Sequence, residues 1–157
     1  MPADDLRLRW ARLEDSSSIA MLEYRSCAYE KRQTPVSLGP GEICALWRKR
    51  LTQEGNSTIL ACIDDQGRER IAGFLAFQGE IRAGKVHALY IEPSCMRRGI
   101  GRFLLDTAGH IVKMQGGDEL EVHVEMLNHG AQAFYRTLHF CASGVRSGHL
   151  IIMTKEI

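Results

Sequence analysis

Apolar positions recur at two different spacings along the chain, and these spacings predict a mixed order of strands and helices. The clearest helix covers residues 100–112, where one apolar stripe repeats every three or four positions. The clearest strand covers residues 120–124, where apolar residues alternate with Glu121 and His123. The remaining apolar runs predict strands at 6–13, 58–63, 71–77, 86–91 and 150–153, and helices at 19–28, 43–51 and 131–138.

Glycine and proline residues mark where these elements end. The sequence Asp64-Asp65-Gln66-Gly67 predicts a turn that joins two strands into a hairpin. Residues 31–41 contain Pro35, Gly39 and Pro40, so the first helix must stop there and the longest loop follows. The resulting order is strand, two helices, three strands, helix, strand, helix, and one or two further strands. This order predicts an α/β (α+β) fold with a mixed central sheet and helices on both faces.

Composition narrows the class of protein. The chain has 157 residues, which favours a single domain over 1–157. Lys and Arg total 20 against 19 for Asp and Glu, which argues against nucleic acid as a partner. No apolar run approaches the roughly 18 residues of a membrane span, and the charged start is unlike a secretory signal. The 5 cysteines are widely spread without a Cys-x-x-Cys pair, so we expect a reduced, cytoplasmic chain with no metal site.

Candidate chemistry is concentrated between the strand at 86–91 and the helix at 100–112. Gly99 and Gly101 open that helix, and arginines stand beside them at 97, 98 and 102. The first turn of a helix has N–H groups without partners and favours an anion, so this loop suits a pyrophosphate. The alternative is a tight turn with a solvated basic rim. A Walker loop is absent, and Leu104 stands where a dinucleotide fingerprint needs a small residue.

Two motifs in this order resemble the GNAT superfamily of N-acetyltransferases. The first is Met96-Arg97-Arg98-Gly99-Ile100-Gly101, which follows a strand. The second is the strand at 120–124 followed by the residues Asn128, Ala131, Phe134-Tyr135 and Leu138-His139-Phe140. The resemblance implies a central sheet of six to seven strands flanked by about four helices. Met96 replaces the usual Gln or Arg, and His139 replaces the usual Gly, which suggests a different turn after the last helix.

The resemblance also implies acetyl-coenzyme A as acyl donor. Its pyrophosphate would lie on the loop residues Arg97, Arg98, Gly99, Ile100, Gly101 and Arg102. Its pantetheine arm would run beside the backbone of Leu89, Tyr90 and Ile91, in a gap where the strand at 86–91 and the strand at 120–124 splay apart. A backbone N–H near Ile91 would then face the thioester oxygen. Asn128 is either a helix cap or a contact to the pantetheine, and both can hold at once.

Two residues are candidates for acid–base catalysis. Tyr135 is either a packed core tyrosine or, by resemblance, the acid that protonates the leaving thiolate. His123 is either a solvent-facing strand residue or the base, since it stands where related enzymes place a carboxylate. Free histidine has a pKa of about 6.5, which suits a base near neutral pH. Glu121, two residues away on the same face, is its rival.

Other candidates carry less weight. His87 and Glu92 flank the donor strand as reserve bases, although such residues are mostly just exposed. Cys95 has no base near it in sequence, so we interpret it as inert. Aromatic residues on the first two helices are more often core than substrate contacts; they are Tyr24, Tyr29 and Trp47.

These features predict an enzyme that moves an acetyl group from acetyl-coenzyme A to a primary amine by direct attack. The alternative is a GNAT-like domain that binds coenzyme A without catalysis. The acceptor would be a small molecule or a peptide, with no nucleic acid, membrane or metal involved. The sequence leaves the acceptor and the oligomeric state open, although a homodimer is frequent in such families.

Overall fold

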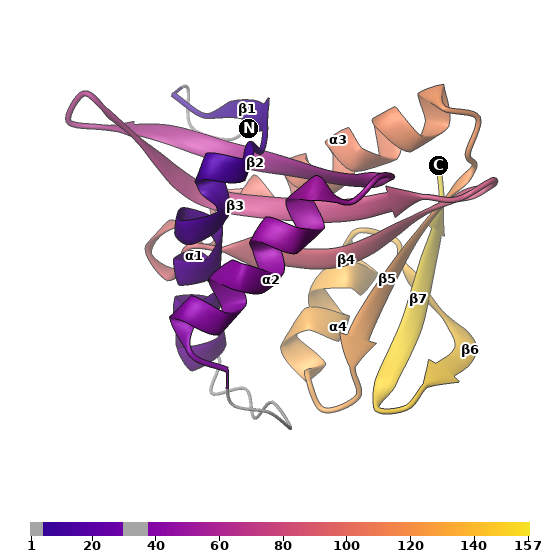
Figure 1. Ribbon diagram of the computed structural model, residues 1–157. Helices are drawn as coiled ribbons and strands as arrows, with labels where there is room; N and C mark the ends of the chain where they lie inside the picture. The colour runs from indigo at the N-terminus through magenta and orange to yellow at the C-terminus, as the bar shows by residue number, and fades with distance from the viewer. Residues whose placement is uncertain (1–4, 30–37) are drawn as a thin grey trace. The chain divides into compact units, whose positions relative to one another are not determined.

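Seven strands pair in the order β1-β2-β3-β4-β5-β7-β6 in the computed structural model, which describes residues 5–29 and 38–157 (Figure 1). The strands are β1 (Arg7–Trp10), β2 (Asn56–Asp65), β3 (Arg68–Gly79), β4 (Ala83–Ile91), β5 (Glu119–Glu125), β6 (Cys141–Ser147) and β7 (Leu150–Glu156). The helices are α1 (Ser16–Tyr29), α2 (Pro40–Thr52), α3 (Ile100–Met114) and α4 (His129–Thr137). Two short 3₁₀ turns are η1 (Leu13–Asp15) and η2 (Pro93–Cys95).

Strand direction makes the sheet mixed. β4 runs parallel to β5, with Ala83 opposite Glu119 and Val86 opposite Val122. β1 is antiparallel to β2, and β7 is antiparallel to both β5 and β6. A parallel pair needs a crossover connection, and α3 supplies it between β4 and β5. The mixed sheet of six to seven strands with about four helices that the sequence predicts is therefore confirmed.

The described residues form two compact units, each with its own core. The first unit comprises the described residues up to Ala76 together with Ala88–Leu104. Its core lies between α1 and α2 and the strands that these helices cover. The buried residues include Ile19, Leu22, Trp47, Leu60, Cys62, Phe74 and Ala88. The Trp47 ring meets the edge of Phe74 with centroids 5.1 Å apart. Burial also raises the pKa of the Cys62 thiol, so that thiol is neutral and apolar in this core.

The lack of a side chain at Gly73 lets the start of α3 pack on the face of β3 that points away from α1 and α2. A Cβ at this position would lie 2.8 Å from Cδ1 of Ile91 and 3.3 Å from Cγ2 of Ile100. Because side chains alternate along a strand, Phe74 faces α1 and α2 while position 73 faces Ile100. Helices therefore lie on both faces of the strands in this unit, as the element order predicts.

The second unit comprises Phe77–His87 and Leu105–Ile157. β5 alternates strictly, and its inner face buries Leu120, Val122 and Val124. The later part of α3 packs on this face because Gly84 of β4 has no side chain; a Cβ there would collide with Val112. Further core residues come from α3, α4, the turn after α4, and β7; they are Leu105, Ala108, Tyr135, Leu138, Phe140 and Met153.

Two boundaries differ from the sequence expectation for a physical reason that the structure shows. The first strand ends at Trp10 rather than residue 13, because the Asp15 carboxylate accepts the Arg12 N–H at 2.7 Å and turns the chain into η1. Arg9 also hydrogen-bonds this carboxylate and lowers the pKa of Asp15. α2 begins at Pro40, since proline is favoured at the first helical position, so the expected loop at 31–41 is shorter at its end. Residues 30–37 of that loop lie outside the described residues.

Candidate active site

The predicted donor segment, residues 89–102, runs from the end of β4 through η2 into the start of α3 and lies within the first unit. Leu89, Tyr90 and Ile91 are partly buried at the end of β4, and the Tyr90 ring packs 5.5 Å from that of Phe74. The chain then turns through Pro93–Cys95 before the glycine loop begins. The order strand, short turn, loop, helix is the one that the sequence predicts.

The glycine loop has the geometry of an open backbone cradle. Gly99 has φ +79, and a Cβ built there meets nothing within 4 Å. Arg97 has φ +63, which is uncommon for a residue other than glycine. The Phe103 N–H donates to Gly99 O at 3.0 Å, so the N–H groups of the residues before Phe103 are those a helix leaves without an intrahelical acceptor. This arrangement can hold an anion beside exposed guanidinium groups at 97, 98 and 102.

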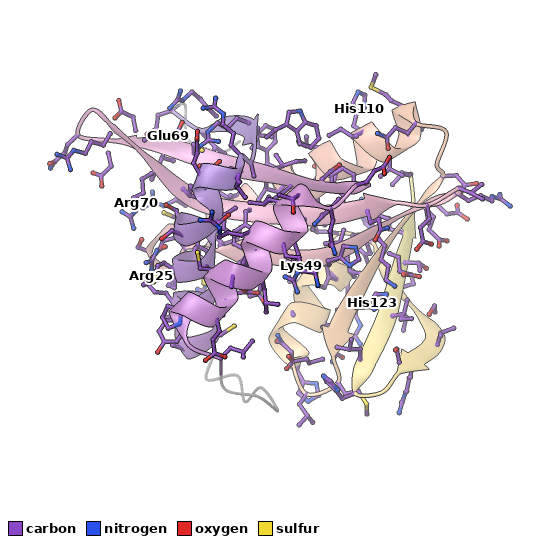
Figure 2. All side chains as sticks on the ribbon, viewed as in Figure 1. Arg25, Lys49, Glu69, Arg70, His110 and His123 are labelled. Carbon is purple, nitrogen blue, oxygen red and sulfur yellow. The ribbon has the colours of Figure 1, made fainter. Side chains whose placement is uncertain are left out.

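The two rival base candidates are joined by a hydrogen bond. His123 Nε2 lies 2.8 Å from Glu121 Oε2, and both side chains project from the face of β5 opposite the core. The side chains are 17% and 26% exposed, so His123 is not the fully solvated residue of the simplest interpretation. A carboxylate that accepts one imidazole N–H fixes the tautomer and leaves the other ring nitrogen as acceptor. Figure 2 labels His123 on β5.

The reserve bases fit the role less well. Glu92 is only 7% exposed, and its carboxylate lies 2.8 Å from Nη2 of Arg25. The expectation that it is simply exposed is wrong, because the ion pair compensates its burial. His87 is exposed, and its Nε2 lies 3.3 Å from Oε1 of Gln78.

Asn128 caps α4, as one of its two interpretations predicts. Its Oδ1 accepts the Ala131 N–H at 3.0 Å. Gln132, which the sequence did not single out, is 5% exposed and donates from Nε2 to the carbonyls of Glu125 (3.1 Å) and Met126 (2.9 Å). These bonds fix the connection between β5 and α4. In the sequence, Gln132 could have been noticed as a polar residue that directly follows Ala131, beside the apolar stripe of this helix.

Tyr135 lies in the core of the second unit. It is 9% exposed, and its ring packs edge-on against Phe140 with centroids 5.5 Å apart. α4 then ends in a Schellman motif: Phe140 N–H donates to Tyr135 O and His139 N–H to Arg136 O, both at 3.0 Å. His139 has φ +71, the left-handed conformation that glycine adopts most readily at this position. The different turn that His139 suggested is therefore not found.

The aromatic residues of α1 and α2 divide into two groups. Trp47 is fully buried, and its Nε1–H donates to Glu23 Oε2 at 3.0 Å, which confirms the core interpretation. Tyr24 and Tyr29 are 41% and 62% exposed, so for them the core interpretation is wrong. Cys95 is 3% exposed and near Ser94 Oγ (3.8 Å), which fits an inert thiol.

Across residues 5–29 and 38–157, no helix is long and apolar enough to cross a membrane. Over the same residues, no three His, Cys, Asp or Glu side chains gather closely enough to hold a metal ion.

Comparison with known proteins gives a family and a fold. The acetyltransferase (GNAT) family matches residues 18–140. Mycothiol acetyltransferase of Beutenbergia cavernae is 33% identical over 64 residues, which are 41% of this chain and 22% of that protein's length. The chain thus spans under a quarter of this curated relative.

Solved structures match nearly the whole chain at low identity. The PaiA N-acetyltransferase of Thermoplasma acidophilum, in complex with coenzyme A, has a TM-score of 0.75 and 19% identity, covering 97% of this chain and 99% of that one. An acetyltransferase from Thermus thermophilus has a TM-score of 0.79 and 18% identity and covers 100% of both chains. These likenesses show a shared fold.

Proposed function

The chain belongs to the GNAT family of acetyltransferases, and we propose that it transfers an acetyl group from acetyl-coenzyme A to a primary amine. The observation that carries this proposal is the loop at Gly99, whose φ of +79 and open surroundings suit a phosphate on backbone N–H groups. The solved relative that holds coenzyme A has the same fold, which supports this choice of donor.

The proposed reaction is a direct attack without a covalent enzyme intermediate. The amine nitrogen forms a bond to the acetyl carbon, and the carbon–sulfur bond then breaks. As the carbonyl oxygen gains negative charge, an N–H near Ile91 stabilises it. The amide product and free coenzyme A leave. Of the two protons that the ammonium group loses, one balances the proton delivered to the thiolate and the other ends in solvent.

We assign proton removal to His123 with Glu121. An aliphatic amine with a pKa of about 10.4 is only about 0.1% neutral at pH 7.4, so a base helps to expose its lone pair. The Glu121 carboxylate accepts one ring N–H of His123, and the other nitrogen takes the proton directly or through water. Imidazole changes charge between about pH 5 and 8, which suits this role.

We assign proton donation to Tyr135. Its hydroxyl gives a proton to the departing thiolate and regains one from solvent. The buried ring and its contact with Phe140 hold the side chain in place. The Asn128 cap and the Gln132 bonds fix α4 at its first turn, and α4 carries Tyr135.

An amine panel tests the proposal. Thiol release from acetyl-coenzyme A would be followed with a peptide α-amine, a lysine peptide, a polyamine and an aminoglycoside, with product masses measured. We expect release that depends on one acceptor class, and an acetylated product. Incubation with acetyl-coenzyme A alone should leave the protein mass unchanged. Coenzyme A binding without transfer to any amine would instead support the non-catalytic binding domain.

A further inference from the structure

The segment that joins β4 to the glycine loop is held by hydrogen bonds from two other elements of the first unit, one from a side chain and one from the backbone. Ser26 Oγ of α1 donates to Ile91 O at 3.0 Å. The Glu92 N–H donates to Ala72 O of β3 at 2.8 Å. The end of β4 is therefore hydrogen-bonded to both α1 and β3, just before the chain enters η2.

The Glu92 carboxylate adds ion pairs to these hydrogen bonds. It is 7% exposed, with Arg25 Nη2 2.8 Å from one oxygen and Arg70 Nη2 3.8 Å from the other. Arg70 Nη2 also donates to Ser94 Oγ at 3.2 Å, within η2 itself. Figure 2 labels both arginines, Arg25 on α1 and Arg70 on β3. A carboxylate is costly to bury unless it is paired, so this arrangement holds all three side chains in one geometry.

We infer that Glu92, held by Arg25 and Arg70, is a positioning residue for the phosphate-binding loop. This inference rests on the proposed function, because it takes the loop at Gly99 as the pyrophosphate site. Only η2 and a few residues separate Glu92 from Gly99. A shift of η2 would therefore also move the loop. A displacement of about 1 Å in a binding site can cost up to about a hundredfold in activity. Pairing also neutralises a carboxylate that would otherwise repel a nearby phosphate.

A second ion pair in the same unit provides a matched control. Asp15 is 9% exposed and is held by both guanidinium nitrogens of Arg9, at 2.8 and 2.9 Å. Like Glu92, it is a buried carboxylate paired with arginine, but it stabilises the start of α1 rather than η2. Replacing either carboxylate with its amide weakens a buried ion pair, and only Glu92→Gln should disturb the loop.

Calorimetric titration with coenzyme A separates positioning from general stability. We expect Glu92→Gln to raise the dissociation constant about fivefold to twentyfold and to raise KM for acetyl-coenzyme A with kcat nearly unchanged. Asp15→Asn should lower the melting temperature comparably and leave the dissociation constant unchanged within error. Arg25→Gln, at a half-exposed side chain, gives a second variant if Glu92→Gln does not fold.

The double variant distinguishes positioning from direct contact of Arg25 with the ligand. If Arg25 acts through Glu92, the Arg25→Gln effect should shrink in the Glu92→Gln background; full additivity would overturn the inference. An unchanged dissociation constant in folded Glu92→Gln would also overturn it, while the proposed function would stand. If the wild type itself failed to bind coenzyme A, the proposed function would fail, and the inference with it.

Discussion

His123 Nε2 lies 2.8 Å from Glu121 Oε2, on the face of β5 opposite the buried Leu120, Val122 and Val124. The sequence presents these residues as rivals for one role, but the structure makes them one hydrogen-bonded pair. A carboxylate that accepts one imidazole N–H fixes the tautomer of the ring. The consequence is that the two residues should be interdependent in any reaction that uses either.

The first prediction concerns the pH dependence of His123→Ala. Turnover should fall most at about pH 6.5–7 and least at high pH, where the acceptor amine is already neutral. The wild-type rate should show an acidic decline with a distinct inflection, which the variant should lack. The variant's rate should instead rise steadily with pH as more of the amine becomes neutral. The measurement is kcat across the pH range with a saturating amine.

Glu121→Gln separates the two members of the pair. We expect a smaller loss of turnover than in His123→Ala, and a double variant no worse than His123→Ala alone, because the residues act as a unit. If the acidic decline survives in His123→Ala and disappears in Glu121→Gln, Glu121 is the base. If it survives in both, the amine loses its proton to bulk water.

The second prediction concerns Tyr135→Phe, which keeps the ring against Phe140 and removes only the hydroxyl. Turnover should drop, within the roughly 10²–10⁴-fold range of acid catalysis, because the thiolate leaves unprotonated. Coenzyme A affinity and melting temperature should stay close to wild type. Unchanged turnover would make the tyrosine structural.

The third prediction separates the two interpretations of Asn128. Asn128→Ala should cost about 1 kcal/mol, since the Ala131 N–H loses its acceptor. That cost should lower the melting temperature by about 2–4 °C. Asn128→Asp keeps the accepting oxygen and removes the amide donor, so its stability should be retained. A loss of coenzyme A affinity in Asn128→Asp at unchanged stability would assign the amide to the ligand.

The fourth prediction concerns the end of α4. His139→Gly should stabilise the protein by about 1 kcal/mol, because glycine takes φ +71 without the steric cost of a Cβ. Ala133→Gly, on the exposed side of the same helix, should destabilise by about 1 kcal/mol and serves as the opposite control. Denaturant unfolding measures both. Destabilisation by His139→Gly would mean that the imidazole has a role that outweighs backbone strain.

Elements with a clear period were predictable from sequence, and those without one were not. β5 alternates strictly and α3 has a continuous apolar stripe, so both were found within two residues of their ends. β6 escaped a firm prediction because all its residues are exposed, and a strand without a buried face shows no alternation. The sequence pattern places Pro40 in the loop before the second helix, whereas in the structure it is the first residue of α2.

The same distinction holds for the candidate site, where features set by local spacing were predictable and long-range contacts were not. The glycine loop and the Asn128 cap depend on local spacing, which the sequence shows. The burial of Glu92 depends on Arg25, 67 positions earlier in the chain, and no local pattern reveals that pairing. Long-range ion pairs of this kind require the fold to be known first.

The proposed function depends on binding of the coenzyme A pyrophosphate at the loop around Gly99, and Gly99→Asp tests this binding. The new side chain would place a negative charge on the proposed site, into space where a Cβ meets nothing within 4 Å. Because φ is +79 at Gly99, any side chain there also costs backbone strain, so the control is Gly67→Asp. Gly67, in the turn between β2 and β3, has the same φ of +79 and equally open surroundings.

The most direct measurement is calorimetric titration of acetyl-coenzyme A into wild type, Gly99→Asp and Gly67→Asp. We predict that Gly99→Asp loses more than about tenfold in affinity, or about 1.4 kcal/mol, while Gly67→Asp binds like wild type. Equal affinity in wild type and folded Gly99→Asp would contradict this prediction and remove the donor site from this loop.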